Sequence, residues 1–261
     1  MTDDAEHGSP VSGNRDVIWP ERFPRSAKYD ARWMRDAAMG PNPLWLTEWL
    51  YEAMDLRPGM RVLDLGCGRA ASSIFLAKEF GVRVWATDLW IGADENWTRI
   101  CEAGLQHEVT PIHANARSLP YAKGFFDAII AIDSYIYFGT DDLYLAYLAP
   151  FVAPGGQIGV VMPGFAQDIG DHLPEHLRPF WGQDCWSWHP AHWWRHHWAR
   201  TGLVDVERSD NLPEAGELWQ RTEEGGDEAH VVAADKGRYM GMIRLVGRTR
   251  PADPDAREIS R

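Results

Sequence analysis

The chain has 261 residues, 45% of them hydrophobic, and this length can bury one substantial core. Its formal net charge of −12 argues against nucleic acid as the main partner, because a phosphate-binding face needs a basic patch. Its three cysteines are too few and too scattered for a disulfide framework or a CxxC metal site. With no run typical of a signal peptide or a membrane span, the sequence predicts a cytoplasmic protein.

The N-terminal part predicts a polar tail and then a helical cap. Residues 1–16 are polar and are expected to be disordered, as are residues 250–261 at the other end. Within the cap, residues 17–58, Asn42-Pro43 is typical of a helix start, with Asn42 as the cap and Pro43 in the first turn. This helix is expected to run to about Met54.

The most informative segment follows at residues 61–73. A short apolar strand leads into a turn with Gly66 and Gly68 and then into a helix. Glycines in such a turn let the backbone come close to a ligand, and the free amides at the start of the helix face that ligand. The segment therefore predicts a cradle for a nucleotide-type cofactor.

Further strands are expected at residues 82–88, 109–114, 126–133 and 157–162, separated by helical segments. This alternation predicts a parallel sheet with covering helices. Residues 190–201 are interpreted as a helix, 204–208 as a strand and 239–248 as the last strand. The core is thus expected over residues 59–163, an aromatic and histidine-rich lid with a helix over 164–203, and the end of the sheet over 204–249.

Two cofactors fit the glycine turn. Gly66-x-Gly68-x-x-Ala71 matches the dinucleotide fingerprint, although a lone match of this kind is weak. Asp64 argues against it, because dinucleotide folds are usually apolar at this strand position. The run Val62-Leu63-Asp64-Leu65-Gly66-Cys67-Gly68 instead resembles the first motif of class I S-adenosylmethionine-dependent methyltransferases. The chain departs from that motif at Ala70, where a third glycine is common.

Later segments extend the resemblance in the family's order. Asp88 ends the second strand about twenty residues beyond the glycines, where the ribose hydroxyls of an adenosine cofactor need an acceptor. The segment from Asn115 to Pro120, the strand that ends at Asp133, and the turn Pro154-Gly155-Gly156 resemble the family's next motifs. The resemblance implies a Rossmann-like, seven-stranded, mostly parallel sheet with helices on both faces and an antiparallel last strand.

The resemblance also implies which residues hold S-adenosylmethionine. The acidic residue of the first motif braces the glycine loop, the loop contacts the methionine part, and Asp88 contacts the ribose. Trp90 is expected on the adenine and Asn115 at the adenine amino group, since an amide oxygen accepts hydrogen bonds. The expected cofactor-binding residues are Asp64, Gly66, Cys67, Gly68, Asp88, Leu89, Trp90, Asn115, Ala116 and Asp133.

Candidates for the acceptor side are less well defined. Asp133 and Tyr137 follow the fourth strand, where ligands bind in open α/β sheets. Similar enzymes often carry a histidine near Ile136, so a base here must come from another segment or be absent. His189 and His192 are candidates, because an unperturbed histidine suits proton removal at neutral pH. Residues expected to contact the substrate are Tyr29, Trp33, Tyr135 and Trp188, and Met39-Gly40-Pro41-Asn42 is expected to reach the cofactor.

Seven tryptophans fall between residues 181 and 219, together with four histidines. Aromatic rings in this segment can hold a flat or cationic substrate, or they can simply pack on the sheet. Packing is favoured for Trp194 and Trp198, which lie four residues apart on one helical face. His189, His192 and His196 share a face as metal ligands would, but no nearby residue completes a tetrahedral set, and no metal is expected.

The sequence therefore predicts a methyltransferase that transfers a methyl group from S-adenosylmethionine to the O, N or C atom of a small molecule by in-line displacement. The alternatives are a cofactor-binding enzyme with non-methylating chemistry, a nicotinamide-dependent oxidoreductase and a non-catalytic cofactor-binding subunit. A small-molecule substrate, no nucleic acid, no membrane, and a monomer or homodimer are expected.

Overall fold

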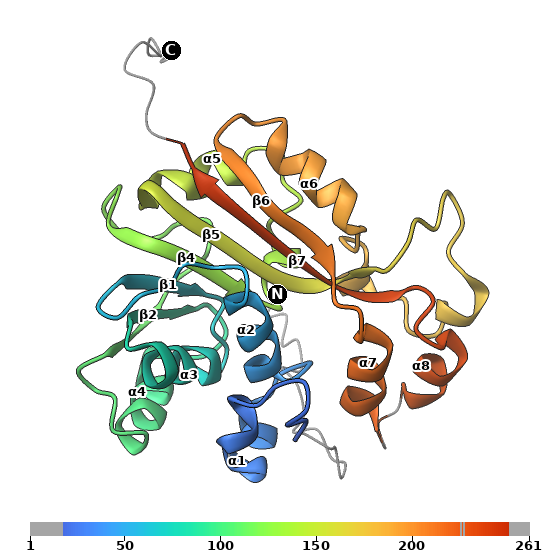
Figure 1. Ribbon diagram of the computed structural model, residues 1–261, viewed down its shortest axis with the longest axis horizontal. Coiled ribbons are helices and arrows are strands. Elements are labelled where there is room, and N and C mark those ends of the chain that lie inside the picture. The colour runs from blue at the N-terminus through green and yellow to red at the C-terminus, as the bar shows by residue number, and fades with distance from the viewer. Residues whose placement is uncertain (1–17, 225, 227, 251–261) are drawn as a thin grey trace, which may run out of the picture.

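The computed structural model describes residues 18–224, 226 and 228–250, so the tails expected at 1–16 and 250–261 lie outside the described residues, except for Arg250. One seven-stranded sheet has the order β3-β2-β1-β4-β5-β7-β6 (Figure 1). Strands β1 to β5 pair in parallel, and β7 is antiparallel to both β5 and β6. The strands are β1 Arg61–Leu65, β2 Arg83–Asp88, β3 Val109–His113, β4 Phe126–Ile132, β5 Val152–Phe165, β6 Val204–Asn211 and β7 Met240–Thr249. The predicted fold class is confirmed.

Helices cover both faces of this sheet. Figure 1 shows α1 to α4 on one face and α5 and α6 on the other. Two hydrophobic clusters result, because successive strand residues point to opposite faces: Val62 belongs to the cluster under α2 and α3, and Leu63 to the cluster under α5 and α6. The helices are α1 Ala31–Ala37, α2 Pro43–Tyr51, α3 Ala71–Phe80, α4 Ala93–Glu102, α5 Tyr144–Leu148, α6 Ala191–Ala199, α7 Ala215–Glu223 and α8 Ala229–Asp235.

The expected cap of α2 is present. The side-chain oxygen of Asn42 accepts a hydrogen bond from the Leu44 amide at 3.0 Å, and Pro43 occupies the first helical position. Helix α6 also lies where it was expected, and Trp194 and Trp198 are fully buried against the sheet. For these two tryptophans packing is therefore confirmed.

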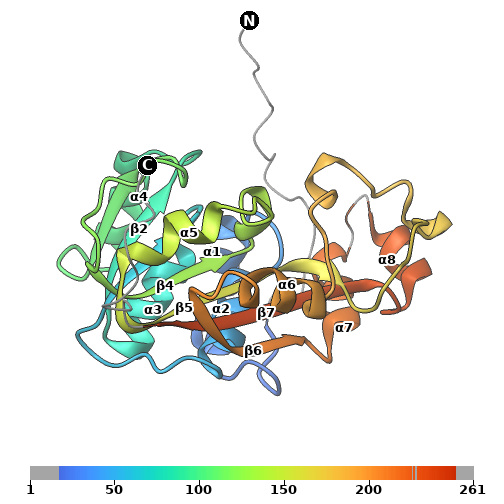
Figure 2. The same ribbon diagram turned by 90° about the horizontal axis from the view of Figure 1, so that it is seen from above.

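The region between β6 and β7 differs from the prediction. It holds α7 and α8, where no element was expected. Helix α7 packs Leu218 and Trp219 inward, and the indole nitrogen of Trp219 donates to the Gly241 carbonyl at 3.2 Å. Figure 2 shows α8 and the segment after β5 at the opposite end of the molecule from α4. Within the described ranges, no helix combines the length and apolar character needed to cross a membrane.

Candidate active site

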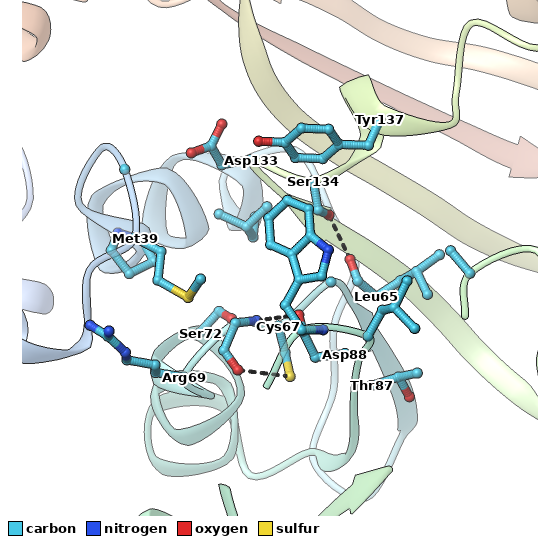
Figure 3. Close-up of a pocket in the computed structure, with 18 of the residues that line it drawn as sticks. Met39, Leu65, Cys67, Arg69, Ser72, Thr87, Asp88, Asp133, Ser134 and Tyr137 are labelled. Carbon is cyan, nitrogen blue, oxygen red and sulfur yellow. Dashed lines mark hydrogen bonds between the residues drawn. The ribbon is translucent and has the colours of Figure 1, made fainter. Parts of the chain in front are cut away.

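A cavity of about 310 Å³ lies at the carboxyl ends of β1, β2 and β4 (Figure 3). Ligands bind at this edge in open α/β sheets. One wall comes from residues 37–43, ahead of α2. The described lining residues are Ala37, Met39, Gly40, Pro41, Pro43, Leu65, Gly66, Cys67, Gly68, Arg69, Ala71, Ser72, Thr87, Asp88, Leu89, Trp90, Ala114, Asn115, Ala116, Arg117, Ile132, Asp133, Ser134, Tyr137 and Phe138.

The glycine loop forms the floor of this cavity. The amides of Gly66 and Cys67 both donate to the Thr87 carbonyl, at 2.8 and 3.1 Å, so the loop is tied to the end of β2. Gly66 has φ +75°, and a Cβ there would lie 2.4 Å from the Ser134 Cβ. Ser134 is itself held by a hydrogen bond to the Leu65 carbonyl at 2.6 Å. Glycine is therefore required both by the torsion and by the close approach of Ser134, just after β4.

Ala70 stands where the resembled family often has a third glycine. Its φ of +59° is left-handed, and it immediately precedes α3. That conformation costs about 1–2 kcal/mol for an L-residue. Burial of the Ala70 methyl group offsets about 0.8 kcal/mol of this cost. Alanine is therefore tolerated here, and no side chain caps the start of α3.

Asp64 is fully buried behind the loop. Its Oδ2 accepts hydrogen bonds from the hydroxyls of Ser72 and Ser73 on α3, both at 2.6 Å. Its Oδ1 has no hydrogen-bond partner among the described residues. Burial raises the pKa of Asp64 to about 6, although the two serine hydroxyls act in the opposite direction. The carboxylate thus holds the end of β1 to α3, although its burial disfavours the ionised form.

The substitution Asp64→Asn is expected to change how stability depends on pH. Because the folded-state pKa of Asp64 lies above its unfolded value, this carboxyl favours the folded state at low pH, and that contribution is lost as pH rises from about 4 to about 6. Two pKa units correspond to about 3 kcal/mol. The unfolding free energy of the wild type minus that of the variant should fall by about this amount across the window. Urea unfolding at several pH values measures the difference, and a pH-independent difference would contradict the burial argument.

Asp88, at the end of β2, lines another side of the cavity. Its Oδ2 accepts the Gly68 amide at 2.8 Å, and its Oδ1 accepts the amides of Trp90 and Ile91 at 2.8 and 2.9 Å. One carboxylate thus organises the glycine loop and the turn after β2 together. Since an ionised carboxylate has about four acceptor positions, it retains capacity for a ligand hydroxyl.

The segment ahead of α2 forms the facing wall. Met39 lies against the glycine loop, since a Cβ on Gly68 would lie 3.0 Å from its sulfur. The Arg69 guanidinium reaches across and donates to the Asp36 carbonyl at 2.9 Å. Met39 and Gly40 therefore line the cavity beside the glycine loop, and their contact with the cofactor stays a prediction.

Asn115 and Ala116, both expected at the adenine, line the cavity beyond β3. The side-chain oxygen of Asn115 accepts the Arg117 amide at 2.8 Å, which fixes the turn. Arg117 is in turn paired with Asp141 at 2.9 Å. The side chains of Asn115, Arg117 and Asp141 therefore fix this edge of the cavity.

Asp133 and Tyr137 lie together at the other end of the cavity, and Figure 3 shows the Tyr137 hydroxyl directed toward the Asp133 carboxylate. Asp133 has φ +53°, and burial together with the charge of Asp184 raises its pKa to about 7. Burial and then the Asp133 charge hold the pKa of Tyr137 above its usual value. The Trp90 ring meets the Tyr137 ring at a centroid distance of 5.1 Å.

The four residues expected at the substrate do not line this cavity. Tyr29 donates to Glu79 at 3.3 Å and stacks on Trp33. Tyr135 is fully buried, with its ring 5.8 Å from that of Trp194. Trp188 is also buried, in the core beside α7. These side chains pack the protein, and the aromatic rings at the cavity belong to Trp90, Tyr137 and Phe138 instead.

The two candidate histidines also lie away from the cavity lining. His189 stacks on Trp193 at a centroid distance of 3.7 Å, and burial lowers its pKa to about 4. His192 is largely exposed and lies 3.3 Å from Asp168. Among the described residues, no group of three or more His, Cys, Asp and Glu side chains is arranged to hold a metal ion. All three cysteines are free.

Sequence reasoning did not assign five polar residues of the cavity to the site. They are Arg69, Ser72, Thr87, Arg117 and Ser134. Each of them lies within four residues of a predicted site residue, so closeness to the motifs was the only feature of the sequence that could have indicated them. Which of these side chains face inward depends on turn geometry, which the motifs alone do not specify.

Comparison with known proteins points to one family. A sequence model described as a methyltransferase domain matches residues 62–156. The curated methyltransferase GfsG from Streptomyces halstedii is 33% identical over 138 residues, which are 50% of this chain and 48% of that protein. Residues 62–156 form a methyltransferase domain of the class I S-adenosylmethionine-dependent family.

Solved structures show the same fold around this methyltransferase domain. Geranyl diphosphate C-methyltransferase from Streptomyces coelicolor A3(2), solved with S-adenosyl-L-homocysteine, has a TM-score of 0.66 at 18% identity, covering 78% of this chain and 76% of that one. The [4+2]-cyclase SpnF has a TM-score of 0.60 at 20% identity and covers 85% of each chain. The chain spans about half the length of the curated relative GfsG.

The cavity of the methyltransferase domain fits the cofactor of its family. The start of α3 is uncapped and lines the cavity through Ala71 and Ser72, which suits a carboxylate such as that of methionine. Asp88 offers an acceptor where the ribose hydroxyls are expected. The unpaired Oδ1 of Asp64 lies directly behind the loop. The cavity therefore offers backbone donors at the start of α3 and a carboxylate acceptor at Asp88, as a zwitterionic nucleoside requires.

Proposed function

We propose that this protein is an S-adenosylmethionine-dependent methyltransferase that acts on a small-molecule acceptor. The observation that carries this proposal is one cavity that is lined both by the glycine loop of the methyltransferase domain and by Asp133, Tyr137 and Trp90. We assign Asp133 and Trp90, which the sequence predicts at the cofactor, to the acceptor end, because both lie with Tyr137 there. A cofactor and an acceptor can therefore meet in the same cavity.

The cofactor half consists of residues that the motifs name. The Gly66–Gly68 backbone and the start of α3 bind the methionine part, Asp88 binds the ribose, and Asn115 with Ala116 borders the adenine. When bound, S-adenosylmethionine supplies a methyl group on a positively charged sulfur. The chain's own contribution is to hold the acceptor in line with that methyl group and to exclude water. Met39 and Gly40 close the cavity above the loop and serve both purposes.

The matched relatives support small molecules as acceptors, and the net charge of −12 supports an acceptor other than nucleic acid. We further propose that the enzyme acts in the cytoplasm as a monomer or homodimer. Incubation with S-adenosylmethionine and pools of small alcohols, amines, thiols and enols tests the reaction. Release of S-adenosylhomocysteine that depends on one pool is expected, whereas cofactor binding without release from any pool would contradict methyl transfer.

Similarity to the cyclase SpnF favours one second candidate, an enzyme that binds the cofactor but does not transfer its methyl group. The named chemistry of that neighbour is a [4+2] cyclisation. A product that forms without stoichiometric S-adenosylhomocysteine would support this alternative. A product heavier by one methylene unit, with S-adenosylhomocysteine in equal amount, would exclude it.

Replacement of either candidate histidine is expected to leave methyl transfer nearly unchanged. His189→Gln and His192→Gln should keep kcat/KM within about two-fold of the wild type, because neither side chain lines the cavity. Steady-state kinetics with the identified acceptor measures this. A decrease of about 100-fold in either variant, about 3 kcal/mol in the barrier, would restore that histidine as the base.

A further inference from the structure

The acceptor end of the cavity carries an unpaired negative charge. Within the described part of the chain, no hydrogen bond or ion pair reaches the Asp133 carboxylate. Gly40 approaches it closely, since a Cβ there would lie 2.4 Å from its Oδ2. Asp133 lines the cavity and is held in a left-handed conformation, so its position is imposed by the surrounding fold.

A second carboxylate adds to this negative potential. Asp184 lies in the short 3₁₀ segment Gln183–Cys185 and acts electrostatically on both Asp133 and Tyr137. Besides each other, the ionisable side chains that shift the pKa values of Asp133 and Tyr137 are Asp184 and, for Tyr137, also the Cys185 thiol. None of them is a cation.

The basic residues of the cavity are engaged elsewhere. Among the described lining residues they are Arg69 and Arg117. Arg69 donates to backbone carbonyls of the segment ahead of α2, and Arg117 pairs with Asp141. In Figure 3, Arg69 lies at the opposite side of the drawn cavity from Tyr137. An anionic acceptor would therefore meet the Asp133 carboxylate, with Asp184 adding negative potential, and neither described lining arginine is free to pair with it at this end.

Aromatic rings complete the same end. Trp90 is 50% exposed and Tyr137 is 45% exposed, although both line the cavity and their rings are in contact at 5.1 Å. Half-exposed aromatic faces beside a carboxylate are the surroundings in which alkylammonium groups bind, through cation–π attraction and a charge pair.

We propose that the methyl acceptor is a cationic amine whose nitrogen is held between the Asp133 carboxylate and the rings of Tyr137 and Trp90. This inference rests on the proposed methyltransferase function and names its substrate class. The ammonium group first gives its proton to the Asp133 carboxylate. The freed nitrogen lone pair then forms the N–C bond while the C–S bond of the cofactor breaks, and the sulfur retains that electron pair. The products are the methylated amine and S-adenosylhomocysteine.

The pKa of Asp133 supports both roles. Burial and the Asp184 charge raise it to about 7, so near neutral pH this carboxyl exchanges a proton readily. Binding of a cation requires the ionised form. Affinity for a permanently charged ligand should therefore rise as pH increases through about 7, whereas a neutral ligand of the same shape should show no such rise.

The test uses three matched probes on the full chain saturated with S-adenosylhomocysteine: choline, its neutral analogue 3,3-dimethyl-1-butanol and the anion 3,3-dimethylbutanoate. Ligand-observed NMR titration should show choline binding at least about ten-fold more tightly than either analogue at about pH 8, with that preference lost at about pH 5.5. Equal binding of the three probes, preference for the alcohol or the anion, or no choline binding would overturn the inference.

Substitutions of single carboxylates test which of them supplies the charge that binds choline. Asp133→Asn keeps the shape, and asparagine tolerates the left-handed backbone. It should weaken choline binding about ten-fold and remove the pH dependence, with S-adenosylhomocysteine affinity within about two-fold of wild type. Asp184→Asn, at an exposed position, should weaken choline binding about two-fold. The control Asp168→Asn, also exposed, should change neither.

The outcomes separate the inference from the function on which it rests. If Asp133→Asn weakens S-adenosylhomocysteine binding and leaves choline binding unchanged, Asp133 belongs to the cofactor site and the inference is wrong. If the wild type does not bind S-adenosylhomocysteine at all, the proposed function itself fails.

Discussion

Gly66→Val is expected to abolish detectable binding of S-adenosylmethionine. A Cβ at this position would lie 2.4 Å from the Ser134 Cβ and 2.6 Å from its hydroxyl, and Ser134 is fixed by its bond to the Leu65 carbonyl. The loop must therefore move away from Ser134, which displaces the amides that are proposed to cradle the cofactor. The left-handed φ of +75° adds strain that a β-branched residue tolerates poorly. Isothermal titration calorimetry measures the affinity.

Gly104→Val is the matched control for this substitution. Gly104 has a similar φ of +73°, but a Cβ there has nothing within 4 Å. The control therefore imposes the same backbone strain without the collision, and should lower stability by about 1–2 kcal/mol while leaving affinity unchanged. Intact binding in Gly66→Val would contradict the role given to the loop.

Asp88→Ala is expected to weaken S-adenosylmethionine binding by about 1–3 kcal/mol, or about 5- to 150-fold. The substitution removes the proposed acceptor for the ribose hydroxyls. It also leaves the amides of Gly68, Trp90 and Ile91 without the carboxylate that now orders them. Calorimetric titration provides the affinity, and Asp94→Ala removes an equal charge from the exposed first turn of α4 as the control.

The two contributions of Asp88 can be separated with a 2′-deoxy analogue of S-adenosylhomocysteine. If the carboxylate contacts the ribose, the wild type should lose affinity for the analogue and Asp88→Ala should show a smaller further loss. Additive losses would indicate that Asp88 acts only through the loop. An unchanged affinity in Asp88→Ala would show that the ribose site lies elsewhere.

The core of the fold was predictable because its signals are local. A charged residue inside an apolar strand, followed by glycines and then a helix, specified β1, the loop and α3 together. Asp88 could be placed by its distance from those glycines. The two helices between β6 and β7 were missed, although Ala215, Leu218, Trp219 and Thr222 have helical spacing. Short helices of this kind are stabilised mainly by packing on the rest of the molecule, which the sequence does not display.

The acceptor side was less predictable for a physical reason. Aromatic composition does not distinguish a substrate lid from a core, and Tyr135 and Trp188 proved to be core residues. His189 and His192 have suitable chemistry, but α6 packs Trp194 and Trp198 on the sheet, and neither His189, just before this helix, nor His192, within it, lines the cavity. Asp133 and Tyr137 line the cavity because they follow a strand of the parallel sheet, a position that topology determines, and their catalytic roles stay predictions.

The most direct test of the account is titration of the purified protein with S-adenosylmethionine, S-adenosylhomocysteine and NADH in parallel. We expect the first two to bind with dissociation constants of about micromolar, or about −8 kcal/mol, and NADH not to bind. Binding of NADH alone would contradict the assignment of the cavity and favour an oxidoreductase.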